Sequence, residues 1–201
     1  MRAGRLLVEV EGGGVAEAQR AAAVLEEARR LVPEDHGATV ALADAYSKAD
    51  RAADARALLV AAAAAHKGRR SKSLSELWRA RSRVELADGD LSESLAALAK
   101  AFEVDPQNAE LAMELGQLAV DLDDGEVATR AFRSVTLMRL AAAGSTEGAT
   151  PAARALAYYQ LGRIAVDQGD KRKARLMVEK AVAEDPALEV ARTLLGELRA
   201  V

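Results

Sequence analysis

Three prolines close the same pattern of residues, and their spacing constrains the fold more than any other feature of this 201-residue chain. Pro33, Pro106 and Pro186 each follow a small residue, an aliphatic residue and an alanine at fixed distances. The preceding residues are Ala21, Leu25 and Ala28, then Ser94, Leu98 and Ala101, then Ala174, Val178 and Ala181. Because proline cannot continue a helix interior, each pattern predicts a helix that ends near its proline. The prolines are 73 and 80 residues apart, and each distance equals two periods of about 34 residues plus an insertion.

Two further repeats that lack the proline fill these gaps. They contain Leu42, Ala43, Tyr46, Ala55 and Leu59 in the first gap, and Leu115, Gly116, Ala119, Ala128 and Phe132 in the second. Leu161-Gly162 and Leu195-Gly196 extend the register to the C-terminus, and Trp78 falls on the tryptophan position of its repeat. The chain therefore resembles the tetratricopeptide repeat family, whose pattern reads W-x2-L-G-x2-Y, A-x3-F and P. This resemblance implies an all-α fold, a right-handed α-solenoid of antiparallel helix pairs that forms a tetratricopeptide-like superhelix.

The register predicts a single tetratricopeptide repeat domain over residues 1–201, with about five repeats and a C-terminal helix. The repeats are expected at 2–35, 36–74, 75–108, 109–154 and 155–188, and the last helix at 189–201. The helices are expected at 15–32, 38–48, 52–66, 73–88, 91–104, 108–123, 126–142, 151–168, 171–184 and 187–199, with inserted loops at 66–73 and 141–150. Residues 5–10 look like the tail of a first helix. This favours a fragment of a longer array, with an atypical capping end as the alternative.

The third repeat departs from the family pattern. Arg81, Ser82 and Glu85 stand where the pattern has Leu, Gly and Tyr. Because Arg81 and Glu85 are four residues apart on one helix, we expect them to pair, while the long arginine stem still covers apolar surface. We expect altered packing around this helix.

Composition and motifs argue against catalysis and metal binding. The chain has no cysteine, which excludes thiolate metal sites and a cysteine nucleophile. His36 and His66 lack a second ligand at metal-binding spacing and are expected at the surface. The acidic segment around Gly125 places glycine where a calcium loop needs a ligand. With no phosphate loop or nucleophile elbow either, we expect no enzyme, no cofactor and no metal.

Charge and hydropathy limit the remaining classes. The formal net charge is −3, so no global basic field attracts nucleic acid or anionic lipid. The longest apolar stretch, residues 58–65, is too short for a membrane span, and the apolar run at 6–10 is too short for a secretory signal. We expect a soluble, cytoplasmic protein.

The resemblance also implies a binding surface. In the family, the first helices of successive repeats line a concave groove, and side chains at the fifth and ninth positions of each repeat commonly reach into it. Here these residues are Val40, Asp44, Arg79, Arg83, Met113, Gln117, Tyr159 and Arg163. Arginine and tyrosine are enriched at binding hot spots, so these positions predict a surface for a protein or peptide partner. The alternative for this surface is an ordinary solvated helix face.

The leading hypothesis is a non-catalytic scaffold or adaptor for protein or peptide partners. A nucleic-acid-binding helical repeat is the first alternative, because residues 67–83 carry seven basic residues and only one acidic residue, Glu76. That segment has no aromatic residue besides Trp78, which the repeat already uses for packing. A solvated loop with a basic helix stripe therefore explains it better. A regulatory module of a larger enzyme is the second alternative.

Overall fold

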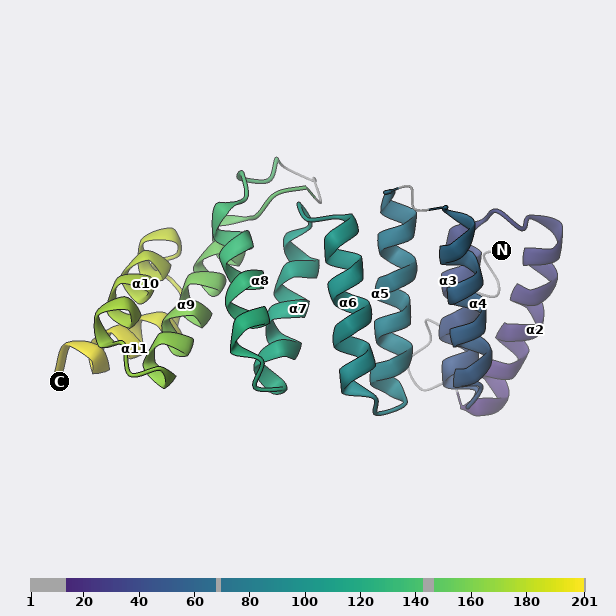
Figure 1. Ribbon diagram of the computed structural model, residues 1–201, viewed down its shortest axis with the longest axis horizontal. Helices are drawn as coiled ribbons and strands as arrows, with labels where there is room; N and C mark the ends of the chain where they lie inside the picture. Colours follow the sequence, from purple (N-terminus) through teal and green to yellow (C-terminus); the bar gives the residue numbers. More distant parts are fainter. Residues whose placement is uncertain (1–13, 68–69, 143–146, 201) are drawn as a thin grey trace. The chain divides into compact units, whose positions relative to one another are not determined.

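A computed structural model describes residues 14–67, 70–142 and 147–200 of the chain (Figure 1). Within these ranges the regular structure consists of ten helices and two isolated backbone bridges. The helices are α2 (Val15–Leu31), α3 (His36–Lys48), α4 (Ala52–Ala65), α5 (Lys72–Ala87), α6 (Leu91–Val104), α7 (Ala109–Asp121), α8 (Gly125–Leu137), α9 (Pro151–Asp167), α10 (Lys171–Glu184) and α11 (Glu189–Ala200). The all-α helical-repeat prediction is confirmed. The helix tail expected at 5–10 lies outside the described residues.

Side-chain caps explain where most of these helices begin. In seven of the described helices, the residue before the first turn accepts a hydrogen bond from the backbone N–H three residues further on, which contributes about 1 kcal/mol per cap. These residues are Asp35, Ser71, Asp90, Asn108, Asp124, Thr150 and Asp170. Gly89 and Gly169 lie in the tight turns between paired helices, where both adopt positive φ angles, 84° and 76°.

The helices form two compact units, Met1–Asp105 and Pro106–Val201. In each unit, every described helix packs on the next one along the chain. In addition, α3 contacts α5 in the first unit, and α7 contacts α9 in the second. This is the contact pattern of stacked helix pairs. We call the side made by α3 and α5, or by α7, α9 and α11, the first-helix face, and the side made by α4 and α6, or by α8 and α10, the second-helix face.

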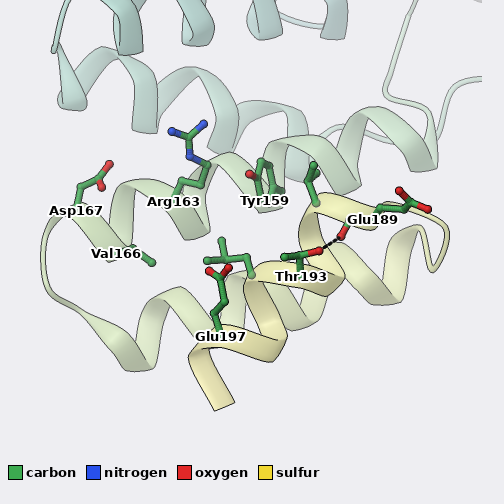
Figure 2. Close-up of a pocket in the computed structure, with 9 residues that line it drawn as sticks. Tyr159, Arg163, Val166, Asp167, Glu189, Thr193 and Glu197 are labelled. Carbon is green, nitrogen blue, oxygen red and sulfur yellow. Dashed lines mark hydrogen bonds between the residues drawn. The ribbon is translucent and has the colours of Figure 1, made fainter. Parts of the chain in front are cut away.

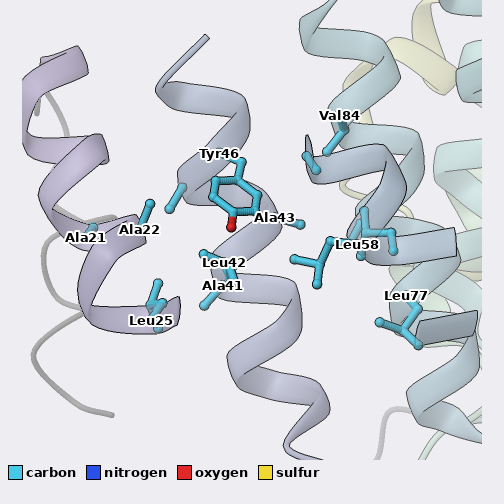
Figure 3. Packing of buried hydrophobic residues seen from close by; sticks show 14 residues of the cluster. Ala21, Ala22, Leu25, Ala41, Leu42, Ala43, Tyr46, Leu58, Leu77 and Val84 are labelled. Atoms are coloured by element: carbon cyan, nitrogen blue, oxygen red, sulfur yellow. The ribbon is translucent and has the colours of Figure 1, made fainter. Parts of the chain in front are cut away.

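The core of the first unit combines many alanines with a few large aliphatic side chains (Figure 3). Its buried members include Ala21, Ala22, Leu25, Leu42, Ala43, Ala45, Leu59 and Leu77. Alanine lets helix backbones approach closely, and the leucines fill the space between the pairs. Close packing of the helices therefore leaves little space that large aromatic side chains would have to fill.

Two glycines in the second unit occupy positions where no side chain fits. A Cβ atom added at Gly116 would lie 2.5 Å from Cε1 of Phe132, and one added at Gly162 would lie 2.5 Å from Cγ2 of Val178. Both contacts are far inside van der Waals distance, and both partner side chains are fully buried. The first helix of each pair thus packs against the second through its small residue.

One helix boundary differs from the prediction by more than two residues. The helix expected at 126–142 ends at Leu137, because Met138 adopts an extended conformation. The chain then folds back on itself: the Ala141 N–H donates to the Ala149 carbonyl at 3.0 Å, and the Ala149 N–H donates to the Arg139 carbonyl at 2.9 Å. These bonds join residues on both sides of the inserted loop. A local helical pattern does not reveal them.

A buried ion-pair network replaces the missing apolar residues of the third repeat. Glu85 is only 1% exposed. Its carboxylate accepts hydrogen bonds from Nε of Arg56 at 2.7 Å and from Nε of Arg81 at 2.5 Å. Arg56 also pairs with Asp88. The predicted Arg81–Glu85 pair is confirmed, and Arg56 of α4 joins it from the neighbouring helix.

The charged state of Glu85 is stabilised inside this network. Burial alone raises the pKa of a carboxyl group, but the hydrogen bonds from Arg56 and Arg81 outweigh it and hold the pKa of Glu85 below its usual range. The same bonds to Glu85 and Asp88 raise the pKa of Arg56. Both shifts favour the charged forms of Glu85 and Arg56 at neutral pH.

Serine takes the glycine position of the same helix. Ser82 and Ser94 are both buried, and their hydroxyl oxygens lie 2.9 Å apart. The Ser94 hydroxyl also donates to the Ser82 carbonyl at 3.0 Å. A pair of small polar side chains that satisfy each other therefore joins α5 to α6 in place of a glycine contact.

We predict that Gly162→Leu destabilises the protein by about 1–3 kcal/mol, because the added side chain collides with the buried and stiff Val178. Gly196 is the matched control, since it holds the same repeat position in α11 but has no atom within 4 Å of an added Cβ. Gly196→Leu should stabilise its helix by about 0.5–1 kcal/mol. Thermal and urea unfolding measure both changes. Equal effects at the two positions would contradict the packing described for Gly162.

We predict that Glu85→Gln lowers the free energy of unfolding at pH 7 by about 2–3 kcal/mol, because two guanidinium groups lose their shared carboxylate. The folded-state pKa of Glu85 is lowered, so its contribution is present above the unfolded pKa of about 4.3 and is lost as pH falls through the folded pKa. The difference between wild type and variant should therefore narrow in acid. Urea unfolding at several pH values measures it.

Glu93→Gln is the control for this series, because Glu93 is exposed and lies 3.8 Å from Arg81. Its effect should stay within about 0.5 kcal/mol at every pH. A Glu85→Gln difference that does not change with pH would mean that the charge of Glu85 is not what stabilises α5.

Candidate functional site

The predicted groove residues of the first unit lie on its first-helix face, where two of them form an ion pair. Nη2 of Arg83 in α5 donates to both carboxylate oxygens of Asp44 in α3, each at 3.1 Å. Arg79 is half-buried and also has an interaction partner. The sequence pattern suggested two arginines available to a partner. The structure instead shows Arg83 bound to a carboxylate of the neighbouring helix.

In the second unit, the predicted residue Gln117 belongs to a row of hydrogen-bonded polar side chains. The side-chain N–H of Gln160 in α9 donates to the Gln117 side-chain oxygen in α7 at 3.2 Å, and Gln117 donates to Asp121 at 3.0 Å. Met113, one turn before Gln117, is partly buried. Gln117 thus links α7 to α9 on the first-helix face, with its own side chain still exposed.

A hollow of about 390 Å³ lies between α9 and α11, and the last two predicted residues, Tyr159 and Arg163, line it. Figure 2 shows their side chains beside those of α11. Val166 adds an exposed apolar side chain from α9. The facing wall is formed by α11 and includes Glu189, Val190, Leu194 and Glu197. We call this site the α9–α11 hollow.

The local sequence explains how these side chains converge. Tyr159, Arg163 and Val166 follow one another at intervals of four and three residues, so they share one face of α9. Glu189 lies in the first turn of α11, and the backbone carbonyl of this residue accepts a hydrogen bond from the Thr193 hydroxyl at 3.0 Å (Figure 2). Tyr159 also packs against the buried cluster of Val178, Ala181 and Leu195, which fixes its ring.

The α9–α11 hollow combines apolar walls with charges of both signs. Arg163 is exposed and forms no ion pair with any other described residue. Asp167, Glu189 and Glu197 supply three carboxylates. This arrangement suits a segment with an apolar side chain and a basic group, oriented by the single arginine. The register identified Tyr159 and Arg163, but it missed the α11 wall because that helix was not assigned groove positions.

The basic segment at 67–83 is less available than its sequence suggests. Arg81 pairs with Glu85 and Arg83 with Asp44. Trp78 is half-buried, and the Lys100 ammonium group lies 4.6 Å from its ring centroid. Arg69 lies outside the described residues. The charges on α5 are thus largely occupied by carboxylates of the protein itself.

The two histidines meet, which their sequence positions did not indicate. The rings of His36 and His66 lie 4.8 Å apart, because the start of α3 and the end of α4 are neighbours in an antiparallel pair. Burial and the nearby His36 lower the pKa of His66. Both histidines are half-buried at this contact, rather than fully exposed. In the described part of the chain, no group of three or more possible ligands could hold a metal.

These helix pairs, with a lined hollow on their first-helix face, define an all-α helical-repeat protein of the interaction-scaffold class. Two tetratricopeptide repeat models match the sequence, one over residues 75–118 and one over residues 155–188. Tetratricopeptide repeats are therefore present in these two segments. No protein of curated function matches it significantly in sequence.

Solved structures support the same fold. The crystal structure of YrrB, described as a TPR protein with an unusual peptide-binding site, is 20% identical, with 89% of this chain and 84% of that chain covered and a TM-score of 0.58. BtubC from P. vanneervenii is 20% identical, with 92% and 82% covered and a TM-score of 0.60. The C-terminal part of a TPR repeat-containing protein from Cytophaga hutchinsonii is 13% identical, with 99% and 70% covered and a TM-score of 0.63.

The helices of the described residues were also compared with the requirements for a membrane span. None of them combines the necessary length with sufficient hydropathy.

Proposed function

We propose that this protein is a non-catalytic adaptor that binds a peptide segment of a partner along its first-helix face. The partner contacts Asp44, Arg79 and Arg83 in the first unit, or Met113, Gln117, Tyr159 and Arg163 in the second. The observation that carries the proposal is the α9–α11 hollow, where predicted groove residues line a real depression. Tetratricopeptide repeats are interaction modules in general.

The α9–α11 hollow is the anchoring point of the proposed peptide. Tyr159 offers an amphipathic ring that packs against the core. Arg163 offers an exposed guanidinium group that forms no ion pair with another described residue. Tyrosine and arginine carry much of the energy at protein interfaces. Val166 and Val190, both exposed, add apolar area. That YrrB is described as having a peptide-binding site is consistent with this role for a similar fold.

The chemistry of the hollow favours a peptide that carries a basic residue beside an apolar one. The apolar side chain packs on Val166, Val190 and Tyr159, while the basic group approaches Asp167 or Glu197. Such complementary charges orient a peptide and reject acidic competitors. A carboxylate of the same peptide can pair with Arg163.

The two alternative functions differ from this one in what they require. Nucleic-acid binding requires free cations over the segment 67–83, and the pairing of Arg81 and Arg83 argues against it. A regulatory module requires a catalytic segment elsewhere in the same gene product. Neither alternative explains why the α9–α11 hollow combines an anchored tyrosine with an unpaired arginine.

We predict that either Arg163→Glu or Val190→Asp weakens the binding of a peptide by about 2 kcal/mol, where the peptide is one selected for binding to the intact chain. Both residues are exposed, so the fold should persist. Selection of phage-displayed peptides followed by titration calorimetry measures the loss. Arg172→Glu on α10 is a matched charge reversal outside the hollow, and it should change affinity by less than about 0.5 kcal/mol. If the selected peptides bind both hollow variants as tightly as the wild-type protein, the α9–α11 hollow is not their binding site.

We predict that single- or double-stranded nucleic acid binds no more tightly than the salt-sensitive background of about 10⁻⁴ to 10⁻⁶ M. The reason is that the arginines of α5 are already paired with carboxylates. Fluorescence anisotropy at physiological salt tests this, with Lys67→Glu and Arg70→Glu as loop reversals. Submicromolar binding that these reversals abolish would make nucleic-acid recognition the better function.

A further inference from the structure

A second depression of about 680 Å³ lies on the second-helix face of the second unit. Its long wall is α8, from Glu126 past Arg130 and Arg133 to Leu137. Gln168, at the end of α9, and Lys173, in the first turn of α10, form the opposite side. We call this depression the α8–α10 trough. It shares no lining residue with the α9–α11 hollow.

The helical period places the lining residues of α8 in two adjacent rows. Glu126 and Arg130 are four residues apart, as are Arg133 and Leu137, so each pair lies on one helix face. The distance along the helix from Glu126 to Leu137 is about 17 Å. The α8–α10 trough is thus long enough for about three turns of a bound helix or for a short extended segment.

The cations of the α8–α10 trough have no carboxylate partners. Arg130, Arg133 and Lys173 are all exposed, and none forms an ion pair with another residue of the described ranges. By contrast, Arg154 in the same unit is bound to Glu184 at 2.6 Å. Glu126 is the one carboxylate among the residues that line the trough. The residues that line the trough therefore carry three positive charges and one negative charge around a wall that is mostly apolar, in a protein whose net charge is −3.

An apolar side chain sits at the end of this row of cations. Leu137 is 75% exposed. The neighbouring arginine and lysine stems are also aliphatic up to their charged ends. A partner that covers Leu137 removes apolar area from water at the same place where it neutralises the cations.

We propose that the α8–α10 trough is a second docking site, which binds an acidic peptide segment of a protein partner. The segment places carboxylates on Arg130, Arg133 and Lys173 and packs one bulky apolar side chain against Leu137. Arginine–carboxylate pairs are charge-assisted and can be bidentate, which gives such a site both affinity and orientation. This preference for acidic segments is opposite to that of the α9–α11 hollow, so the adaptor holds two different partner segments.

Nucleic acid fits the α8–α10 trough less well. The lining residues include no aromatic side chain on which a base could stack. Three cations alone give only weak phosphate binding at physiological salt. The exposed leucine contributes nothing to a phosphate backbone, whereas it is useful to an acidic and partly apolar peptide.

The test uses the full chain and a fluorescein-labelled peptide of about 12 residues, about 18 Å long as a helix, in which glutamates surround a central pair of leucines. Fluorescence anisotropy at physiological salt compares it with two matched peptides, one with lysine for glutamate and one with serine for leucine. We expect the Glu/Leu peptide to bind at least about tenfold more tightly than either. If the Glu/Leu peptide binds no more tightly than the lysine peptide, the proposal is wrong.

Variants locate the binding site. Arg130→Glu combined with Arg133→Glu should weaken the Glu/Leu peptide by about tenfold or more, and Leu137→Ser should weaken it severalfold. All three residues are exposed, and circular dichroism checks that each variant is folded. Arg172→Glu is the charge control and should leave the affinity within about twofold. An unchanged affinity in the double reversal would contradict the site.

Two further measurements separate this proposal from the other functions. Arg163→Glu, in the α9–α11 hollow, should leave the affinity for the acidic peptide unchanged. The proposals for the two sites are therefore tested independently of each other. A single-stranded DNA that binds more tightly than the peptide, and loses affinity in the Arg130→Glu and Arg133→Glu double variant, would assign the trough to nucleic acid instead.

Discussion

Close approach between the two helices of each pair is the constraint on which the rest of the structure depends. At Gly162 the backbone of α9 lies so near Val178 that no Cβ atom fits, and Gly116 stands in the same relation to Phe132. Because the helices touch at these points, few large aromatic residues are needed to fill the core. The remaining faces of the helices are then free for other side chains, and both clefts of the second unit combine apolar surface with charged groups.

The third repeat shows that this constraint can be met by polar chemistry. Ser82 replaces the glycine and is satisfied by Ser94, while Glu85 replaces an aromatic residue and is satisfied by Arg56 and Arg81. A buried carboxylate without these partners would be strongly destabilising. The network therefore preserves the packing of α5 while it makes that packing dependent on charge.

Charge that is neutralised internally also determines where partners can bind. In the first unit, Arg83 is bound to Asp44, and Arg81 is bound to Glu85. In the second unit, Arg163 beside α11 and Arg130 on α8 have no such partners among the described residues. Unpaired cations keep their full interaction energy for a ligand, so the second unit carries the better candidate sites. The neighbouring carboxylates make the hollow suited to basic segments, whereas the trough is suited to acidic ones.

The sequence by itself determined the helices, their order and their packing faces. The reason is that each repeat of about 34 residues carries the small and large residues with which its own two helices pack together. The sequence also indicated Tyr159 and Arg163 as surface positions. Only the tertiary structure decided which charges are free. Arg83 and Asp44 are 39 residues apart, His36 and His66 meet across a helix pair, and α8 ends early because residues beyond the loop bind its continuation. Such contacts depend on distances between helices, which no repeat pattern encodes.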